Sequence, residues 1–168
     1  MSKQPRVTAR RITEADLDHY RRLRMNALKL APEAFGTTYA QVEALSQDDW
    51  LTRVRRFAES QEAVCFIAFN DDAPAGIVAC FVSETPQMVQ MWVEPEHRGN
   101  QVGEKLISEL KSWVKAIGFR EIKAWVRDSN QPAISLYERL GFLPTGKAER
   151  DSLNPAINEI EIMWIAGR

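Results

Sequence analysis

One segment of this 168-residue chain limits its fold more than any other. Residues 88–93 form a short apolar run, residues 102–117 carry apolar side chains at helical spacing, and residues 121–126 form a second short apolar run. A strand, a helix and a second strand in this order form a right-handed crossover, whose two strands lie parallel in one sheet. The sequence therefore predicts a sheet that contains a parallel pair.

The rest of the chain predicts antiparallel strands and three further helices. The other strand-like runs are residues 7–12, 63–69, 77–82, 142–147 and 157–165. Helix signals begin at Thr13, Ser46 and Asn130, whose side chains suit a helix N-cap. Residues 33–39 and 70–76 are expected to be a loop and a turn. We therefore expect a single α/β domain over residues 1–168, with a mixed, twisted central sheet of about seven strands flanked by four helices.

The composition excludes several functional classes. Lys and Arg number 22 against 23 Asp and Glu, so the net charge is −1 and no overall field attracts nucleic acid or an anionic membrane. The longest uncharged stretch, residues 73–83, is too short to cross a membrane, and residues 1–6 are not followed by the apolar core of a secretory signal. We expect no nucleic-acid partner and no membrane partner.

The cysteines and histidines argue against disulfide and metal chemistry. Cys65 and Cys80 lie in apolar runs and are interpreted as buried thiols in a reducing compartment, which predicts a cytoplasmic protein. The histidines are His19 and His97, and no Cys/His cluster has the spacing of metal ligands, so we expect no metal.

The loop between the first crossover strand and its helix indicates an anion site. Backbone N–H groups at a helix start are unpaired and bind phosphate well. Gly99 and Gly103 allow close approach of a ligand to the backbone, and Arg98 can add a charge-assisted hydrogen bond. The glycine spacing fits neither a P-loop nor a dinucleotide fingerprint. A plain helix entry with incidental glycines is the alternative.

Two motifs together resemble the GNAT superfamily of acyl-CoA-dependent N-acyltransferases. The family's acyl-CoA loop, [Q/R]-x-x-G-x-[G/A], follows a strand that ends in hydrophobic-x-Pro. Its later motif is N-x-x-A-x-x-x-Y-x-x-x-G-F. The first is matched by Val93-Glu94-Pro95 and then by Arg98, Gly99, Asn100, Gln101, Val102 and Gly103. The second is matched by Asn130, Ala133, Tyr137, Gly141 and Phe142. Gln101 departs from the pattern, because the family has a glycine there, and its Cβ is expected to change the backbone path slightly.

The resemblance implies acetyl-CoA as co-substrate and assigns the parts of its site. The two parallel strands would splay apart, and Met91, Trp92 and Val93 would pair with the pantetheine arm as an added strand would. The amides of residues 99–103, with Arg98, would bind the pyrophosphate, and Asn130 would also contribute to the cofactor site. Tyr137 would protonate the departing thiolate as a general acid.

The implied reaction is direct attack of a primary amine of a small molecule or peptide on acetyl-CoA in a ternary complex. Glu84, Glu94 and His97 are candidate bases, with a water relay as the alternative. The resemblance places acceptor contacts in residues 33–39 and 147–158, where Glu33, Glu149 and Asp151 could attract a cationic amine.

Several points stay open at this stage. Arg21, Arg22 and Arg24 are expected to form a solvated helix face, with an anion-binding lip as the alternative. A non-catalytic acyl-CoA-binding or sensor domain of the same fold is the second functional hypothesis, and a nucleotide-binding module is the third. The oligomeric state is undetermined, with a homodimer as one option.

Overall fold

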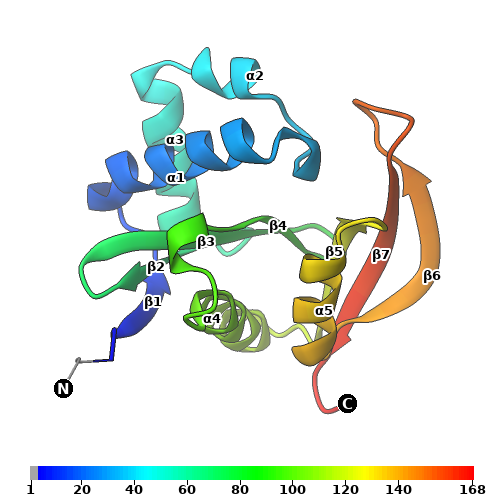
Figure 1. The fold of residues 1–168 in the computed structure, drawn as a ribbon. Helices are drawn as coiled ribbons and strands as arrows, with labels where there is room; N and C mark the ends of the chain where they lie inside the picture. Colours follow the sequence, from blue (N-terminus) through cyan, green and yellow to red (C-terminus); the bar gives the residue numbers. More distant parts are fainter. Residues whose placement is uncertain (1–3) are drawn as a thin grey trace.

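In the computed structural model, which describes residues 4–168, a seven-stranded mixed sheet separates two helical layers (Figure 1). Residues 1–3, part of the segment interpreted above as lacking a secretory signal, lie outside the described residues. The strands are β1 (Val7–Arg11), β2 (Ala63–Asn70), β3 (Ala73–Val82), β4 (Pro86–Val93), β5 (Glu121–Arg127), β6 (Leu143–Arg150) and β7 (Asn158–Ile165). The α-helices are α1 (Leu17–Leu30), α2 (Tyr39–Glu43), α3 (Gln47–Glu59), α4 (Val102–Ala116) and α5 (Gln131–Arg139). The strand order is β1-β2-β3-β4-β5-β7-β6.

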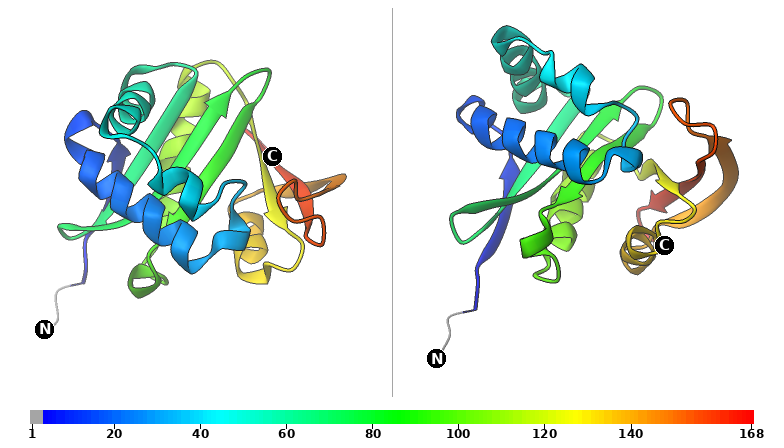
Figure 2. Two further views of the ribbon diagram at one scale, coloured as in Figure 1. Left: turned by 90° about the horizontal axis from the view of Figure 1, so that it is seen from above. Right: turned by 45° about the horizontal axis from the view of Figure 1, so that its top comes forward.

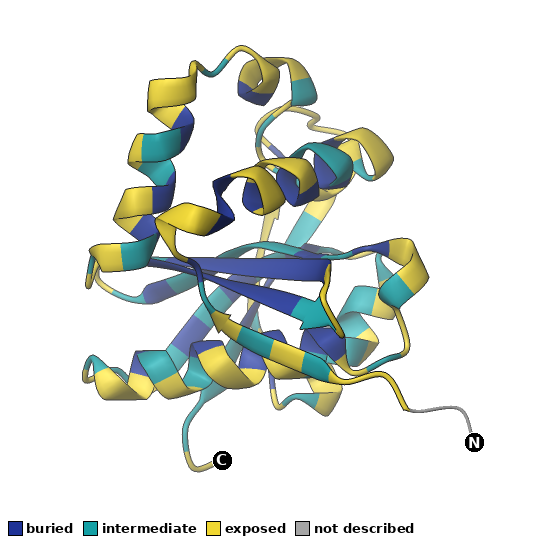
Figure 3. Ribbon diagram, turned by 90° about the vertical axis from the view of Figure 1, so that its left-hand side faces the viewer, coloured by how far each residue is buried: buried dark blue, intermediate teal, exposed yellow. Residues whose placement is uncertain are grey.

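Alternation of side chains along the strands builds a separate core on each face of the sheet. In β2, Val64 and Phe66 pack toward α4, whereas Cys65 and Ile67 pack toward α1 and α3. Both faces of β2 and β3 are therefore apolar, and Figure 3 shows these central strands in dark blue between helices with exposed outer faces. Helices α1 and α3 lie on the face opposite to α4 (Figure 1).

The parallel pair is present, and it diverges. Strands β4 and β5 are paired at Gln87 and Lys123, near the start of each strand. Beyond Gln87, β4 pairs with β3 on one side, and among the described strands β5 pairs with β7 instead. The strands β5, β6 and β7 consequently turn away from the strands β1 to β4 (Figure 2). The expected mixed sheet of seven strands with a parallel pair and four long helices is confirmed.

One local prediction was wrong, and one short helix was not predicted. The expected turn over residues 70–76 is only the two-residue connection at Asp71 and Asp72, and β3 already starts at Ala73. Gly76 lies inside β3, where a Cβ would stand 2.6 Å from the carbonyl oxygen of Trp92, so this glycine permits close strand approach rather than a turn. In the expected loop, Thr38 accepts a hydrogen bond from the Gln41 N–H and starts the short helix α2.

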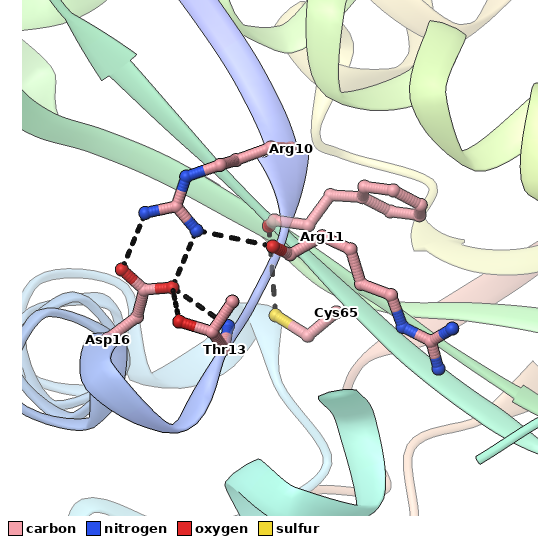
Figure 4. Close-up of polar contacts among 6 residues, drawn as sticks. Arg10, Arg11, Thr13, Asp16 and Cys65 are labelled. Carbon is pink, nitrogen blue, oxygen red and sulfur yellow. Dashed lines mark hydrogen bonds and ion pairs between the residues drawn. The ribbon is translucent and has the colours of Figure 1, made fainter. Parts of the chain in front are cut away.

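An ion pair between the exposed Arg10 and the buried Asp16 fixes the start of α1. The Arg10 guanidinium donates to both carboxylate oxygens of Asp16, at 2.7 and 2.8 Å, and Asp16 also accepts from the Thr13 N–H (Figure 4). Burial alone would raise the Asp16 pKa, but these hydrogen bonds outweigh it and hold the pKa below its usual value. The pair ties α1 to the edge strand β1.

Both cysteines are buried, as predicted. Cys65 and Cys80 are fully inaccessible, and burial raises the pKa of both thiols, to about 12 for Cys80.

Over residues 4–168, none of the helices combines the length and the apolar character that a membrane crossing requires.

Candidate functional site

A cavity of about 1220 Å³ opens where β4 and β5 diverge. Its walls come from β4, the loop into α4, β5, α5, the connection after α1, and the β6–β7 connection. The structure gathers ten of the predicted site residues around it: Met91, Trp92, Val93, Arg98, Gly99, Gln101, Val102, Gly103, Asn130 and Tyr137. Asn100 is not part of the wall, because its side-chain amide turns back to the His97 carbonyl oxygen at 3.3 Å.

The β4 wall carries a β-bulge. Ile77 pairs with Trp92 and Ala79 with Val89, so Gln90 and Met91 together oppose the single residue between them on β3. Gln90 has a left-handed backbone, with φ of 54°. The buried Tyr20 hydroxyl of α1 donates to the Gln90 side-chain oxygen at 2.9 Å and holds the bulge in place. Because β5 has turned away, backbone groups of β4 at this bulge face the cavity edge without a strand partner there.

The start of α4 forms the second wall. Gln101, the residue that departs from the glycine pattern, is the N-cap of α4 and has φ of 64°. It therefore keeps a left-handed backbone that glycine adopts freely, at a strain cost of roughly 1–2 kcal/mol.

Gly103 and Arg98, on either side of Gln101 in the sequence, each make contacts that shape this wall. A Cβ at Gly103 would lie 3.2 Å from both Leu136 Cδ2 and Met91 Cε, so this glycine lets α4 approach β4 and α5 closely. Arg98 donates from Nε to the Val93 carbonyl oxygen at 3.1 Å, and its guanidinium lies 5.0 Å from the Trp92 ring centre. The charge of Arg98 is thus held at the end of β4.

Helix α5 supplies Tyr137 and Asn130. The Tyr137 ring packs 5.8 Å from Phe142, the residue is 8% exposed, and burial raises its pKa to about 12. The phenol is therefore protonated and able to donate a proton at neutral pH. Asn130 accepts the Ala133 N–H at 3.3 Å, so its carbonyl oxygen is used to cap the helix.

The three candidate bases occupy different places. Glu84 is exposed on the β3–β4 connection, and Glu94 is buried and accepts a hydrogen bond from Asn26 at 2.9 Å; neither lines the cavity. His97 does line it, and its Nδ1 lies 3.2 Å from the Asn70 side-chain amide.

The sequence reasoning missed Glu159 on β7. This half-buried carboxylate lines the cavity, and burial, together with Asp151 and Glu149, raises its pKa. Glu149 stands directly opposite it in the β6–β7 pairing. The alternation of residues 157–165 could have placed Glu159 on a face, but its neighbours follow only from the register of the hairpin.

The end of the cavity between the connection after α1 and the β6–β7 connection contains both signs of charge. Glu33 lines it and pairs with Arg127 at 3.8 Å, whereas Asp151 accepts the N–H groups of Leu153 and Asn154 and so orders its own turn.

Arg21 and Arg22 form the exposed face expected of α1. Arg24 does not, because it is 3% exposed and lines the cavity.

Comparison with known proteins agrees with this geometry. The sequence model of a family described as the acetyltransferase (GNAT) family matches residues 26–142, which is more than half of the chain. An uncharacterized N-acetyltransferase of Methanocaldococcus jannaschii is 28% identical over 143 residues. That alignment covers 80% of this chain but 60% of the archaeal protein, so the chain spans less than two thirds of that relative's length.

Solved structures share the fold. A GNAT-family acetyltransferase from Streptococcus pneumoniae superposes with a TM-score of 0.81 at 19% identity, over 96% of this chain and 100% of that one. The PaiA N-acetyltransferase of Thermoplasma acidophilum, solved in complex with coenzyme A, gives a TM-score of 0.75 at 16% identity, over 95% and 99% of the two chains. At these identities the likeness concerns the fold.

Proposed function

Because the chain belongs to the GNAT family of acetyltransferases, we propose that it transfers the acetyl group of acetyl-CoA to a primary amine of a small molecule or peptide. The observation that carries the proposal is that one cavity joins the glycine loop before α4, the free edge of β4 and the Tyr137 phenol. These are the three parts that binding and cleaving a thioester requires: an anion site, main-chain partners for amides, and a proton donor.

The cofactor half of the proposal rests on unpaired backbone groups. The N–H groups at the start of α4 would bind the pyrophosphate, since the helix dipole favours negative charge there and Arg98 adds a cation. The edge of β4 at Met91, Trp92 and Val93 would pair with the pantetheine amides. A neighbour of the same fold was solved with coenzyme A, which supports this use of the cavity.

The chemical half of the proposal moves two protons. The amine nitrogen forms a bond to the acetyl carbon, the carbon–sulfur bond breaks, and Tyr137 gives its proton to the departing thiolate. The proton lost by the amine passes to a carboxylate or to water. Glu159 suits this role best among the cavity residues, because burial and its acidic neighbours raise its pKa.

The cleft supports catalysis over simple sensing. A sensor domain would be favoured by a blocked acceptor side, but the cavity continues from the α4 loop past β4 to Phe35, Gly36 and Thr37.

The two buried free thiols support a reducing, cytoplasmic setting for this activity.

The test is release of free CoA from acetyl-CoA in the presence of a panel of primary amines. Acetyl-CoA should also raise the melting temperature, whereas ATP at equal concentration should not. The proposal is contradicted if acetyl-CoA produces no thermal shift, or if it binds but none of the amines accelerates CoA release.

A further inference from the structure

We infer that the acceptor is an amine that also bears a carboxylate, an amino acid or a similar small molecule, and that Arg24 binds this carboxylate. The inference rests on the proposed acetyl transfer, and it names the substrate class of that same cavity. Arg24 is a buried cation that lines the cavity and has no anionic partner among residues 4–168.

Burial without a partner is the first observation. Arg24 is 3% exposed, and its Nε and Nη1 atoms are inaccessible and make no hydrogen bond. None of the ion pairs within residues 4–168 involves this side chain. Its charged neighbour is Arg53, and Tyr20 and Cys65 beside it are neutral, since burial raises the pKa of both. A buried guanidinium in such surroundings is unfavourable unless an anion completes the site.

The position of Arg24 is the second observation. It lies on α1 one turn after Tyr20, whose hydroxyl holds Gln90 at the β4 bulge, and Arg24 and Gln90 line the same cavity. The Phe35 ring lies 4.9 Å from the Arg24 guanidinium and 6.4 Å from the Trp92 ring, so an aromatic wall shields this end of the cavity. A carboxylate bound here would hold its amine beside β4.

The Arg24 site is separate from the anion site proposed for the cofactor. Helix α1 covers one face of the sheet, and α4, whose start carries the glycine loop, covers the other. The cofactor's phosphates would therefore occupy the α4 side, leaving Arg24 to the acceptor. One guanidinium matches the single charge of a carboxylate, whereas a phosphate dianion would need more positive charge.

The test compares L-α-amino acids with the carboxamides of the same amino acids as acceptors, by CoA release. We expect kcat/KM to be at least about tenfold higher for the amino acids, because only these can pair with Arg24. The amines of the carboxamides are less basic, so a larger fraction of them is unprotonated at neutral pH, and this difference acts against the expected result. Arg24→Gln should lower kcat/KM about 100-fold for amino acids and little for carboxamides. Arg24→Lys should recover part of the loss, and Arg22→Gln, on the exposed face of the same helix, should change nothing.

Several outcomes would overturn the inference. Carboxamides that serve as well as amino acids would leave acetyl transfer standing and remove the carboxylate from the recognition. Phosphoethanolamine outperforming every amino acid would point to a phosphate instead. Equal losses for both acceptor series in Arg24→Gln, at unchanged acetyl-CoA affinity, would make Arg24 a packing residue.

A binding measurement on the wild-type protein decides the question, because it requires neither turnover nor a variant that folds. Thermal shifts of the wild-type protein with CoA and N-acetyl amino acids, compared with their carboxamides, should favour the carboxylates. Equal shifts would also overturn the inference, whereas absence of CoA release from every amine would instead count against the proposed activity.

Discussion

At the residue scale, Tyr137 offers the sharpest test of the chemistry. Tyr137→Phe keeps the ring that packs against Phe142 and removes only the hydroxyl. We expect acetyl-CoA affinity to be nearly unchanged and kcat to fall about 100-fold, the lower end for general acid catalysis, since a CoA thiolate is already a tolerable leaving group. Steady-state kinetics with a good acceptor measures this. An unchanged kcat across the pH range would make Tyr137 a packing residue.

Glu159 can be recognised by its pH dependence. A base must be ionised, and because burial and two acidic neighbours raise the Glu159 pKa, the rate should fall on acidification at a higher pH than an ordinary glutamate would give. Glu159→Gln should remove this acidic limb and lower kcat about 100-fold. Glu149→Gln is the matched control: it keeps Glu159 but removes one neighbouring charge, so the limb should move to lower pH. An acidic limb that survives in Glu159→Gln would assign the proton to another group or to water.

The residues that were foreseen and those that were missed differ in what decides their position. Gly99 was recognisable because its left-handed backbone favours glycine, and Gly103 because a side chain there would press on Leu136 and Met91. Arg24 follows Tyr20 by four residues and precedes Leu28 by four, so the helical spacing already placed it on the buried face of α1. Its charge, however, favoured placing it on the solvent-exposed face. Glu159 depends on the register of β6 and β7, which the sequence does not reveal.

At the scale of the element, the start of α4 tests how much strain the site stores. Gln101→Gly should stabilise the fold, because glycine adopts the left-handed backbone without strain. The extra backbone freedom of glycine in the unfolded chain offsets part of this gain, so we expect a net rise of about 0.5–1 kcal/mol in the free energy of unfolding. Urea unfolding measures it. Gln101→Ala keeps the strain and loses the side chain. A Gly variant no more stable than the Ala variant would show that the conformation at residue 101 costs little.

The elements themselves were largely predictable because their signals are local. N-cap side chains and apolar periodicity located α1, α3, α4 and α5. The failures have non-local causes. Gly76 resembles a turn residue in sequence, and only the Trp92 carbonyl of the neighbouring strand explains it. Helix α2 is five residues long, too short for a periodic pattern, although its Thr38 and Gln41 cap was readable.

At the scale of the whole molecule, the sheet consists of two parts that meet at one parallel contact. Strands β1 to β4 form one part and β5 to β7 the other, and the joining pair is Gln87 with Lys123. The crossover in the sequence predicted that β4 and β5 are parallel. It did not predict how early they separate, because that depends on the bulge at Gln90 and on the pairing of β5 with β7.

This arrangement predicts where acetyl-CoA changes local stability. A ligand pairing with the free edge of β4 would act as an added strand between the two parts, so hydrogen exchange should slow most at Met91 to Val93 and at residues 99–103. At a concentration 100 times Kd, binding stabilises the fold by about 2.7 kcal/mol, which corresponds to a rise in Tm of about 5–11 °C for a chain of this size. Dephospho-CoA, which retains the pantetheine and pyrophosphate, should protect the same segments, whereas ATP should leave β4 unprotected. Protection confined to the α4 start, with β4 exchanging as in the free protein, would mean that the cavity binds the phosphates but not the pantetheine. That outcome would contradict the geometry proposed for acetyl transfer.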